Sequence, residues 1–176
     1  MHTSGLRHGV MPTKPVISPW RRLINTSKVM TIAVADNGTA WSAPVYYLFD
    51  EKRFYFFSNP SARHIKLSKN AREGASSGLS AASNGLDAAS IFQDDADIKN
   101  LAGIQMSGTI LKSPLNARSV SVAKKYCRHF KISGNPMDIL GFFASKFHAG
   151  LYFFEPDRVY YMDNSMGFGS RETVVL

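Results

Sequence analysis

Residues 30–57 read MTIAVADNGTAWSAPVYYLFDEKRFYFF and contain three strand-like runs separated by two turn signals. Large and small side chains alternate over Met30–Ala35, which predicts a strand. Asn37-Gly38 tolerates the positive φ angles of a tight hairpin, so a return strand is expected over Ala40–Phe49. After a turn at 50–53, the aromatic run Phe54–Phe57 predicts a third, buried strand. Tight turns between successive strands favour an antiparallel meander.

Further elements are expected on both sides of this meander. Short helices are predicted from Ser18 to Ile24, with Ser18 as N-cap, and from Pro60 to Asn70, with Asn59 as N-cap. Other predictions are strands at Gly74–Leu79, Ala88–Phe92 and Gly103–Leu111, helices at Ser113–Gly134 and Pro136–Phe147, and a hairpin of Leu151–Phe154 with Arg158–Met162. This order predicts a mostly β fold, an antiparallel barrel with peripheral helices, because closure removes exposed sheet edges.

Composition limits the possible classes of protein. The 176 residues suffice for one domain, so we expect a flexible arm at 1–17 and a single domain at 18–176. No apolar run is long enough to span a bilayer, and a cytoplasmic location is expected. The single cysteine, Cys127, lies in a predicted helix and is interpreted as a packing residue, and no pair of His or Cys has metal-ligand spacing.

The formal net charge of +8 favours an anionic ligand. The basic residues are spread along the chain, without a dense tract and without interleaved aromatic residues, so nucleic acid is a weaker expectation than a small anion such as a phosphate.

The segment from Ser58 to His64 is the strongest candidate for a phosphate site. A buried strand is expected to end there and a helix to begin, and the N–H groups of a helix start attract anions. Ser58, Asn59 and Ser61 add short polar side chains, Arg63 adds a planar guanidinium that matches phosphate geometry, and His64 adds another donor. The alternative is an ordinary capped helix whose charges are solvated.

The same segment resembles a known family. A strand, a Ser-rich turn, a basic residue at Arg63, Leu67 four positions on and Asn70 seven positions on are similar to the phosphate-binding stretch of the pyridoxamine 5'-phosphate oxidase-like FMN-binding split-barrel family. Trp41–Asp50 resembles the family's second strand, and Gly103–Gly108 resembles a later strand that carries a Gln.

Three further motifs resemble the YhbP-like branch of that family in particular. They are Tyr47–Asp50, the pair Arg63-His64, and the ending Asp163–Gly169. The resemblance covers residues 18 to 170. It departs from pyridoxamine 5'-phosphate oxidase itself, because Ser42 to Tyr46 holds no Arg, so that enzyme's own reaction is not predicted.

The resemblance implies a homodimer that binds FMN at its interface. It implies that the backbone of Ser42, Ala43, Pro44 and Val45 lies along the isoalloxazine ring. It implies that Arg63 neutralises the FMN phosphate, that Ser58 and Ser61 complete the phosphate site, and that Gln105 bonds to the phosphate or the ribityl chain. Asn59 and His64 join this cofactor site from the analysis of the segment itself.

The activity implied is that of a flavin-dependent oxidoreductase whose substrate the sequence does not identify. No acid or base stands out, so no catalytic residue is named. The alternative is a non-catalytic dimer that binds or senses a flavin, a deazaflavin or haem.

Overall fold

The computed structural model describes residues 17–76, 87–134, 136–146 and 148–176, so the predicted arm lies almost wholly outside the described residues. The helices are α1 (Pro19–Thr26), α2 (Arg63–Ser76), α3 (Ala117–Phe130) and α4 (Pro136–Lys146), with short 3-10 helices η1 (Ile98–Asn100) and η2 (Asn164–Met166). The strands are β1 (Val29–Asp36), β2 (Thr39–Tyr46), β3 (Leu48–Asp50), β4 (Arg53–Ser58), β5 (Asp87–Gln93), β6 (Ala102–Lys112), β7 (Gly150–Asp163) and β8 (Arg171–Thr173).

The predicted hairpin at Asn37-Gly38 is confirmed. Asn37 and Gly38 have φ angles of 45° and 74°, and β1 pairs with β2 in register from Asp36↔Thr39 onward. Positive φ at both turn residues gives the twist that suits a two-residue hairpin. The side chains of Met30, Ile32 and Val34 are buried, as the alternation in β1 predicts.

Both pairs of the predicted antiparallel meander are present, because β1 pairs with β2 and β3 pairs with β4. The strand order is β2-β1-β5-β6-β7-β4-β3, with β8 on β7, so β1 pairs with the later strand β5 and β4 pairs with β7. Local turn signals predict the pairs that the turns connect, but not the long-range pairs of β1 with β5 and of β4 with β7.

The single return strand predicted over Ala40–Phe49 is two strands, β2 and β3, separated by Tyr47. Tyr47 is buried; its hydroxyl donates a hydrogen bond of 2.7 Å to the carbonyl of Ile24, and its backbone N–H bonds to the carbonyl of Lys28. Because β2 and β3 are the two ends of the strand order, the chain at Tyr47 joins the ends of the barrel covalently.

The hairpin predicted across Glu155–Asp157 is also wrong, because 150–163 form the one long strand β7. Its pairing with β6 continues past Pro156 through a bulge opposite Gly108, which absorbs the extra residue. A Cβ at Gly108 would lie 2.2 Å from the carbonyl oxygen of Glu155, so only glycine fits the close approach of the two strands.

The helices are confirmed with shifted bounds. α1 starts at Pro19 after Ser18, although the Ser18 side chain makes no capping bond. α2 starts at Arg63 rather than Pro60 and runs past Asn70 to Ser76, so Gly74–Ser76 are helical where a strand was predicted. α3 starts at Ala117 rather than Ser113, because Asn116 forms a capping box with Ser119. The predicted strands near 88–92 and 103–111 are confirmed as β5 and β6.

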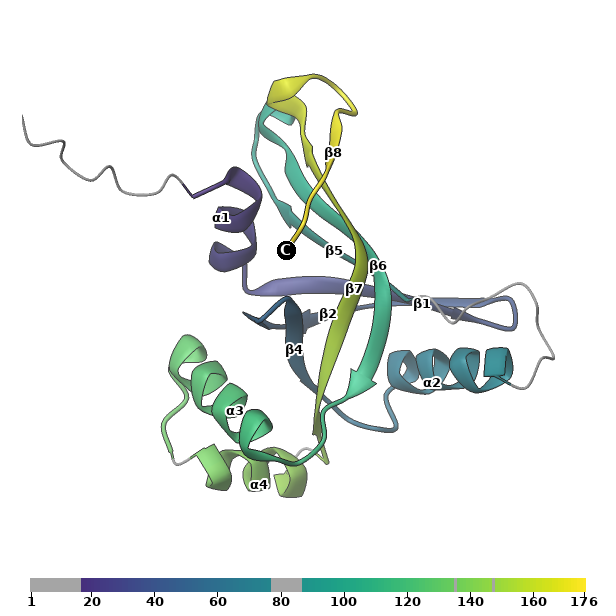
Figure 1. Cartoon of the computed structure of the whole chain (residues 1–176), viewed down its shortest axis with the longest axis vertical. Coiled ribbons are helices and arrows are strands. Elements are labelled where there is room, and N and C mark those ends of the chain that lie inside the picture. The colour runs from purple at the N-terminus through teal and green to yellow at the C-terminus, as the bar shows by residue number, and fades with distance from the viewer. Residues whose placement is uncertain (1–16, 77–86, 135, 147) are drawn as a thin grey trace, which may run out of the picture.

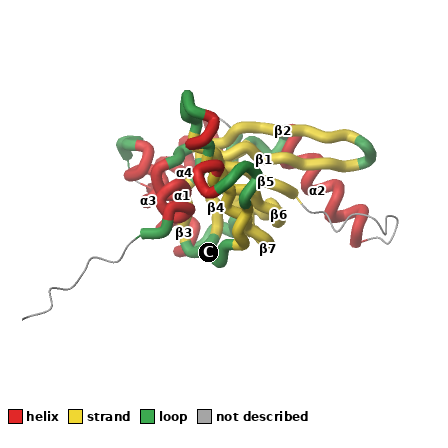
Figure 2. The backbone as a smooth tube through the Cα atoms, turned by 90° about the horizontal axis from the view of Figure 1, so that it is seen from above, coloured by secondary structure: helices red, strands yellow, loops and turns green. Residues whose placement is uncertain are grey.

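The core lies inside the curved sheet, and the helices cover different parts of it. The largest fully buried side chains include Tyr47, Phe54, Phe56, Phe154, Ile32 and Ile104. Figure 1 shows α2 alongside the β1–β2 hairpin and the pair α3 and α4 beneath the lower ends of β4, β6 and β7. Figure 2, seen from above, shows α2 on the opposite side of the molecule from α1, α3 and α4. The predicted mostly β architecture with peripheral helices is confirmed.

A buried carboxylate anchors α2 to the sheet. Asp87, at the start of β5, is 2% exposed, and its Oδ2 accepts hydrogen bonds from Ser68 Oγ at 2.7 Å and from the Ile110 N–H at 2.8 Å. Arg72, one helical turn after Ser68, donates to the carbonyl of Ile110. Burial raises the pKa of Asp87, while these hydrogen bonds and the charge of Arg72 oppose that shift.

Replacing Gly108 by alanine tests the crossing of β6 and β7. The new methyl group would overlap Glu155 and Pro156, so Gly108→Ala should lower the free energy of unfolding by about 3 kcal/mol. Urea unfolding followed by circular dichroism measures this. Gly74→Ala is the matched control, because a Cβ there meets nothing within 4 Å and alanine favours the helix. A stability of Gly108→Ala equal to that of the control would contradict the packing described.

Candidate functional site

The junction between β4 and α2 forms a tight corner. The side chain of Asn59 accepts a hydrogen bond of 2.7 Å from the Ser61 N–H, and its carbonyl accepts one of 2.9 Å from the Ala62 N–H. Pro60 lies in this turn and not in the helix. The turn displaces the start of α2 to Arg63, so the positive end of the helix lies three residues further along than the sequence predicts.

Ser58 and His64 hold the two sides of this corner together. Ser58 Oγ and His64 Nε2 are 2.8 Å apart, and both side chains are buried. Burial lowers the pKa of His64, so its neutral form is favoured. Both were predicted to contact a ligand; the structure turns them toward each other, where they fix the first turn of α2 against the end of β4.

Arg63 connects the corner with β2. Its guanidinium lies over the ring of Trp41, with Cζ 4.5 Å from the ring centroid. Both side chains are exposed, and none of the acidic side chains in the described ranges forms an ion pair with Arg63. A planar cation held flat on an aromatic ring keeps its N–H edges available for an anion.

The neighbouring strand β2 presents a hydrogen-bonding edge. Within the described parts of the chain β1 is its only strand partner. Asp36 and Thr39 close the hairpin, so the alternation of an antiparallel ladder directs the backbone polar groups of Ser42 and Pro44 away from β1. Pro44 lacks an N–H and is suited to an edge strand. A flat polar ring could therefore bond to this edge without competing with a neighbouring strand.

The four residues predicted on β2 divide between its two faces. Ala43 and Val45 pair with Ile32 and Met30, whose side chains are buried. Ser42 and Pro44 are exposed on the outer face. The side chains of these four residues therefore do not form one cluster. What residues 42–45 have in common is the backbone of β2, whose unpaired edge lies near the corner.

Gln105 is separated from the corner within one chain. It stands on β6 between Ser90 of β5 and Tyr160 of β7, in a row that continues to Thr31 and Pro44. Strands β5 and β1 lie between β6 and β2, which at the usual strand spacing separates Gln105 from Pro44 by about 14 Å. The loop around η2 is also remote, at the top of Figure 1, whereas α2 lies lower and to the right.

Trp41 was placed at the start of the strand that resembles the family's second strand, but it was not named as a member of this site. The alternation of Trp41 with Ala43 and Val45 is visible in the sequence, but the packing of α2 against β2 is not. In the parts of the chain that the structure describes, no three His, Cys, Asp or Glu side chains gather into a metal site. No described helix combines the length and apolar character that crossing a membrane requires.

Comparison with known proteins identifies relatives of similar sequence. No family model matches the chain. The chain is 26% identical to UPF0306 protein YhbP from Escherichia coli O157:H7 over 164 residues. This alignment covers 92% of each chain. The chain resembles the YhbP proteins over nearly its whole length. This confirms the resemblance predicted from the sequence.

Solved structures share the fold at low sequence identity. HutZ, a haem storage protein from Vibrio cholerae, matches with a TM-score of 0.59 and 10% identity over 80% of this chain and 89% of its own. A pyridoxinephosphate oxidase family protein related to general stress protein 26, from Clostridium acetobutylicum, matches with a TM-score of 0.55 and 14% identity. The match covers 89% of this chain and 92% of that protein. An FAD-binding protein from Mesorhizobium loti matches with a TM-score of 0.52 and 14% identity, over 81% of this chain and 92% of that protein. The fold is that of the pyridoxamine 5'-phosphate oxidase-like split barrels, as predicted.

The buried His64 predicts a specific dependence of stability on pH. An unfolded histidine takes up a proton near pH 6.5, whereas burial lowers the pKa of His64 in the fold. The unfolded state therefore binds more protons as the pH falls below about 6.5, and the fold loses stability. His64→Gln should weaken the fall in melting temperature between pH 7 and pH 5. His148→Gln, at an exposed histidine, should keep the wild-type slope. Equal slopes for both variants would contradict this role of His64.

Proposed function

We propose that the chain is an FMN-binding protein in which the corner of Arg63 binds the cofactor's phosphate. The observation that carries the proposal is the position of the Arg63 guanidinium, over Trp41 and at the start of α2. Helix start and guanidinium both attract an anion, and the stacked ring limits the directions in which Arg63 can point.

Each predicted site residue has a place in this proposal. Arg63 pairs with the phosphate, while Asn59 and Ser61 form the turn over which the phosphate lies. Ser58 and His64 are assigned to holding the corner, and the backbone of Ser42 to Val45 is assigned to the isoalloxazine ring. The small side chains on the outer face of β2 fit the close approach of a flat ring.

The proposal includes a homodimer with the cofactor between the subunits. Within one chain Gln105 lies three strand spacings, about 14 Å, from Pro44 of β2, so we assign its predicted role to the Gln105 of a second copy. The outer faces of β1, β2 and β5 offer exposed small side chains that permit close contact between copies: Ala33, Ala35, Ala40, Ser42 and Ala88.

Bound FMN would supply electron transfer to or from a substrate. The residues of this chain bind the phosphate, orient the ring along β2 and exclude water from its covered side. We therefore assign a flavin-dependent oxidoreductase and name no catalytic side chain. A cytoplasmic location is a separate part of the proposal and comes from the sequence analysis.

The decisive experiment identifies the small molecule that leaves the denatured full-length protein, by mass spectrometry. FMN in the released fraction, together with flavin absorbance of the native protein, is the expected result. A colourless protein that also fails to bind added FMN in equilibrium dialysis would refute the proposal.

A second candidate is a non-catalytic dimer that holds a flavin, a deazaflavin or haem. It is favoured by the shared fold with HutZ, a haem storage protein. Titration with haem distinguishes the two, because a ligated haem changes its absorbance and FMN would not displace it. Oxidation of reduced nicotinamide by the flavin-loaded protein, with an added electron acceptor, would separate an oxidoreductase from a binding protein.

Arg63→Ala should weaken FMN binding by 10-fold to 100-fold, since a charge-assisted hydrogen bond to phosphate contributes about 1.5–3 kcal/mol. Isothermal titration calorimetry at fixed salt measures the affinity. Lys66→Ala is the matched control, because it removes a positive charge one turn along α2 and should change the affinity little. Equal losses in both variants would reduce the role of Arg63 to general surface charge.

A further inference from the structure

A cavity of about 270 Å³ lies where β7 and β8 meet the start of α1 and the loop of η2. The residues that line it are Pro19, Tyr161, Asp163, Met166, Ser170 and Glu172. This is the upper part of the molecule in Figure 1, whereas α2 and the corner lie lower and to the right. The volume is slightly below the range of about 300–1,000 Å³ that is typical for drug-sized ligands, so the cavity suits a smaller molecule.

Strand register brings three polar side chains to one wall of this cavity. Tyr161 and Asp163 are two residues apart on β7 and therefore face the same side of the sheet. Glu172 pairs with Tyr161 across the β7–β8 ladder, so its side chain lies on that side as well. Arg171 pairs with Met162 and faces the opposite side. The basic residue of β8 is thus directed away from the cavity.

The polar atoms of this wall are hydrogen-bond acceptors. Asp163 accepts from the Tyr161 hydroxyl at 3.0 Å and from the N–H and hydroxyl of Ser165 at 2.9 and 2.6 Å. These three bonds leave one of the roughly four acceptor positions of the Asp163 carboxylate free, and they direct the hydroxyl hydrogen of Tyr161 away from a ligand. Glu172 accepts no hydrogen bond from the described residues. The wall therefore offers acceptors to an occupant and no donor.

The wall also carries negative charge that no described basic residue balances. The hydrogen bonds from Ser165 hold the pKa of Asp163 below its usual range. Burial, the hydrogen bond to Asp163 and the charge of Glu172 raise the pKa of Tyr161 to about 12, so its hydroxyl stays protonated. Within the described ranges no Lys or Arg forms an ion pair with either carboxylate. In a chain of net charge +8, this cavity is a locally negative site that attracts a cation.

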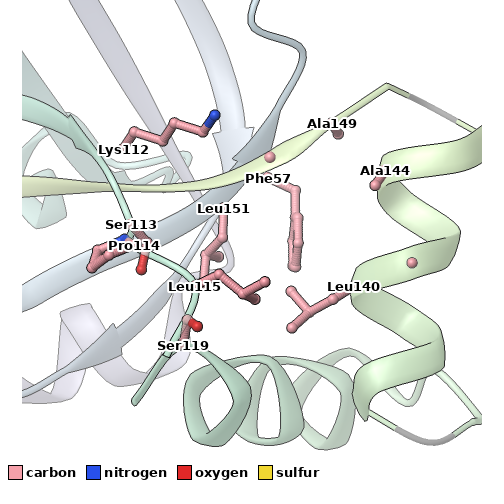
Figure 3. Close-up of a pocket in the computed structure, with 12 residues that line it drawn as sticks. Phe57, Lys112, Ser113, Pro114, Leu115, Ser119, Leu140, Ala144, Ala149 and Leu151 are labelled. Carbon is pink, nitrogen blue, oxygen red and sulfur yellow. The ribbon is translucent and has the colours of Figure 1, made fainter. Parts of the chain in front are cut away.

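A second hollow, between α3, α4 and the lower ends of β4, β6 and β7, has a different lining (Figure 3). Phe57, Leu140 and Leu151 converge on its centre, and the ammonium group of Lys112 points away from it. Such an apolar lining selects no class of ligand. The acceptors and the charge beside Tyr161 do select one.

The arrangement favours a primary ammonium ion over a metal ion. An ammonium group has three N–H donors and no acceptor, which matches a wall of acceptors alone. Calcium takes about six to eight oxygen ligands, whereas no three His, Cys, Asp or Glu side chains gather in the described residues. Pro19 and Met166 add apolar surface to the lining. Met166 is 78% exposed, so a short alkyl chain would remove part of it from water.

We propose that this cavity binds a small primary alkylammonium ion, whose N–H groups bond to Asp163, Glu172 and the Tyr161 oxygen and whose alkyl chain contacts Pro19 and Met166. The site is separate from the FMN corner and does not depend on the proposed function.

The test is an NMR titration of the full-length protein with n-butylammonium chloride at neutral pH. Saturable binding is expected, with amide shifts concentrated at residues 161–163 and 170–172. 1-Butanol lacks the charge, and butyltrimethylammonium has the charge without N–H donors. Each should bind about tenfold more weakly, as expected for the loss of hydrogen bonds between charged groups.

Filling the cavity tests its position. Ser170→Leu places a larger side chain in the lining and should weaken butylammonium binding about tenfold or more. Ser170 is exposed, so the melting temperature of this variant should equal that of the wild type. Ser121→Leu adds the same side chain to an exposed position of α3 outside the cavity and should bind as the wild type does.

The charge is tested by a second pair of variants. Glu172→Gln should weaken butylammonium binding about threefold, as expected for an exposed charge pair. Asp157→Asn removes an exposed carboxylate of β7 that does not line the cavity, and should leave the affinity unchanged.

The absence of saturable binding by the wild type, or wild-type affinity in Ser170→Leu, would overturn the proposed site. Equal losses in Glu172→Gln and Asp157→Asn would overturn the role of Glu172. Equal affinities of the wild type for butylammonium and butyltrimethylammonium would overturn the primary ammonium group as the class of ligand.

Discussion

The buried carboxylate of Asp87 is the constraint on which the position of the corner depends. Among the described residues the pairing of β5 with β6 reaches Asp87 and Gly108, and two residues further along β6 the Asp87 side chain accepts from the N–H of Ile110 while Arg72 donates to its carbonyl. The same carboxylate holds Ser68. α2 is thereby fixed against the sheet at its centre, and the Ser58–His64 pair fixes its first turn. Both attachments hold the helix in the direction that places Arg63 over Trp41.

The sequence was sufficient to predict local structure wherever a short-range signal decides it. Asn37-Gly38 predicts its hairpin because few other dipeptides tolerate two positive φ angles. The alternation in β1 and β6 likewise identifies their buried faces. The errors occurred where tertiary packing decides. Glu155-Pro156-Asp157 has the composition of a turn, yet a bulge opposite Gly108 lets the strand continue. Tyr47 has no local signal as a break, because its partners are backbone carbonyls of residues 24 and 28.

The candidate site was predicted to a similar degree. A strand followed by a polar turn and a helix pointed to the corner, and the structure retains Asn59, Ser61 and Arg63 there. The contact of Arg63 with Trp41 joins residues 22 positions apart and depends on how α2 lies across β2, which no local pattern encodes. The inward hydrogen bond between Ser58 and His64 could not be inferred either, because a polar residue at a helix start is equally compatible with facing solvent.

The covalent connection between β2 and β3 at Tyr47 has a consequence for self-association of the protein. Within the described residues the two end strands, β2 and β3, are joined by the chain and not by hydrogen bonds, so the longer of them, β2, has an unpaired edge. Such an edge is a template on which foreign strands can add, and proline is one of the devices that blunt it. Pro44 removes one donor from the middle of that ladder, and its ring interrupts the regular spacing that an added strand would need. An occupant of this edge would cover the same backbone groups with which an added strand would pair.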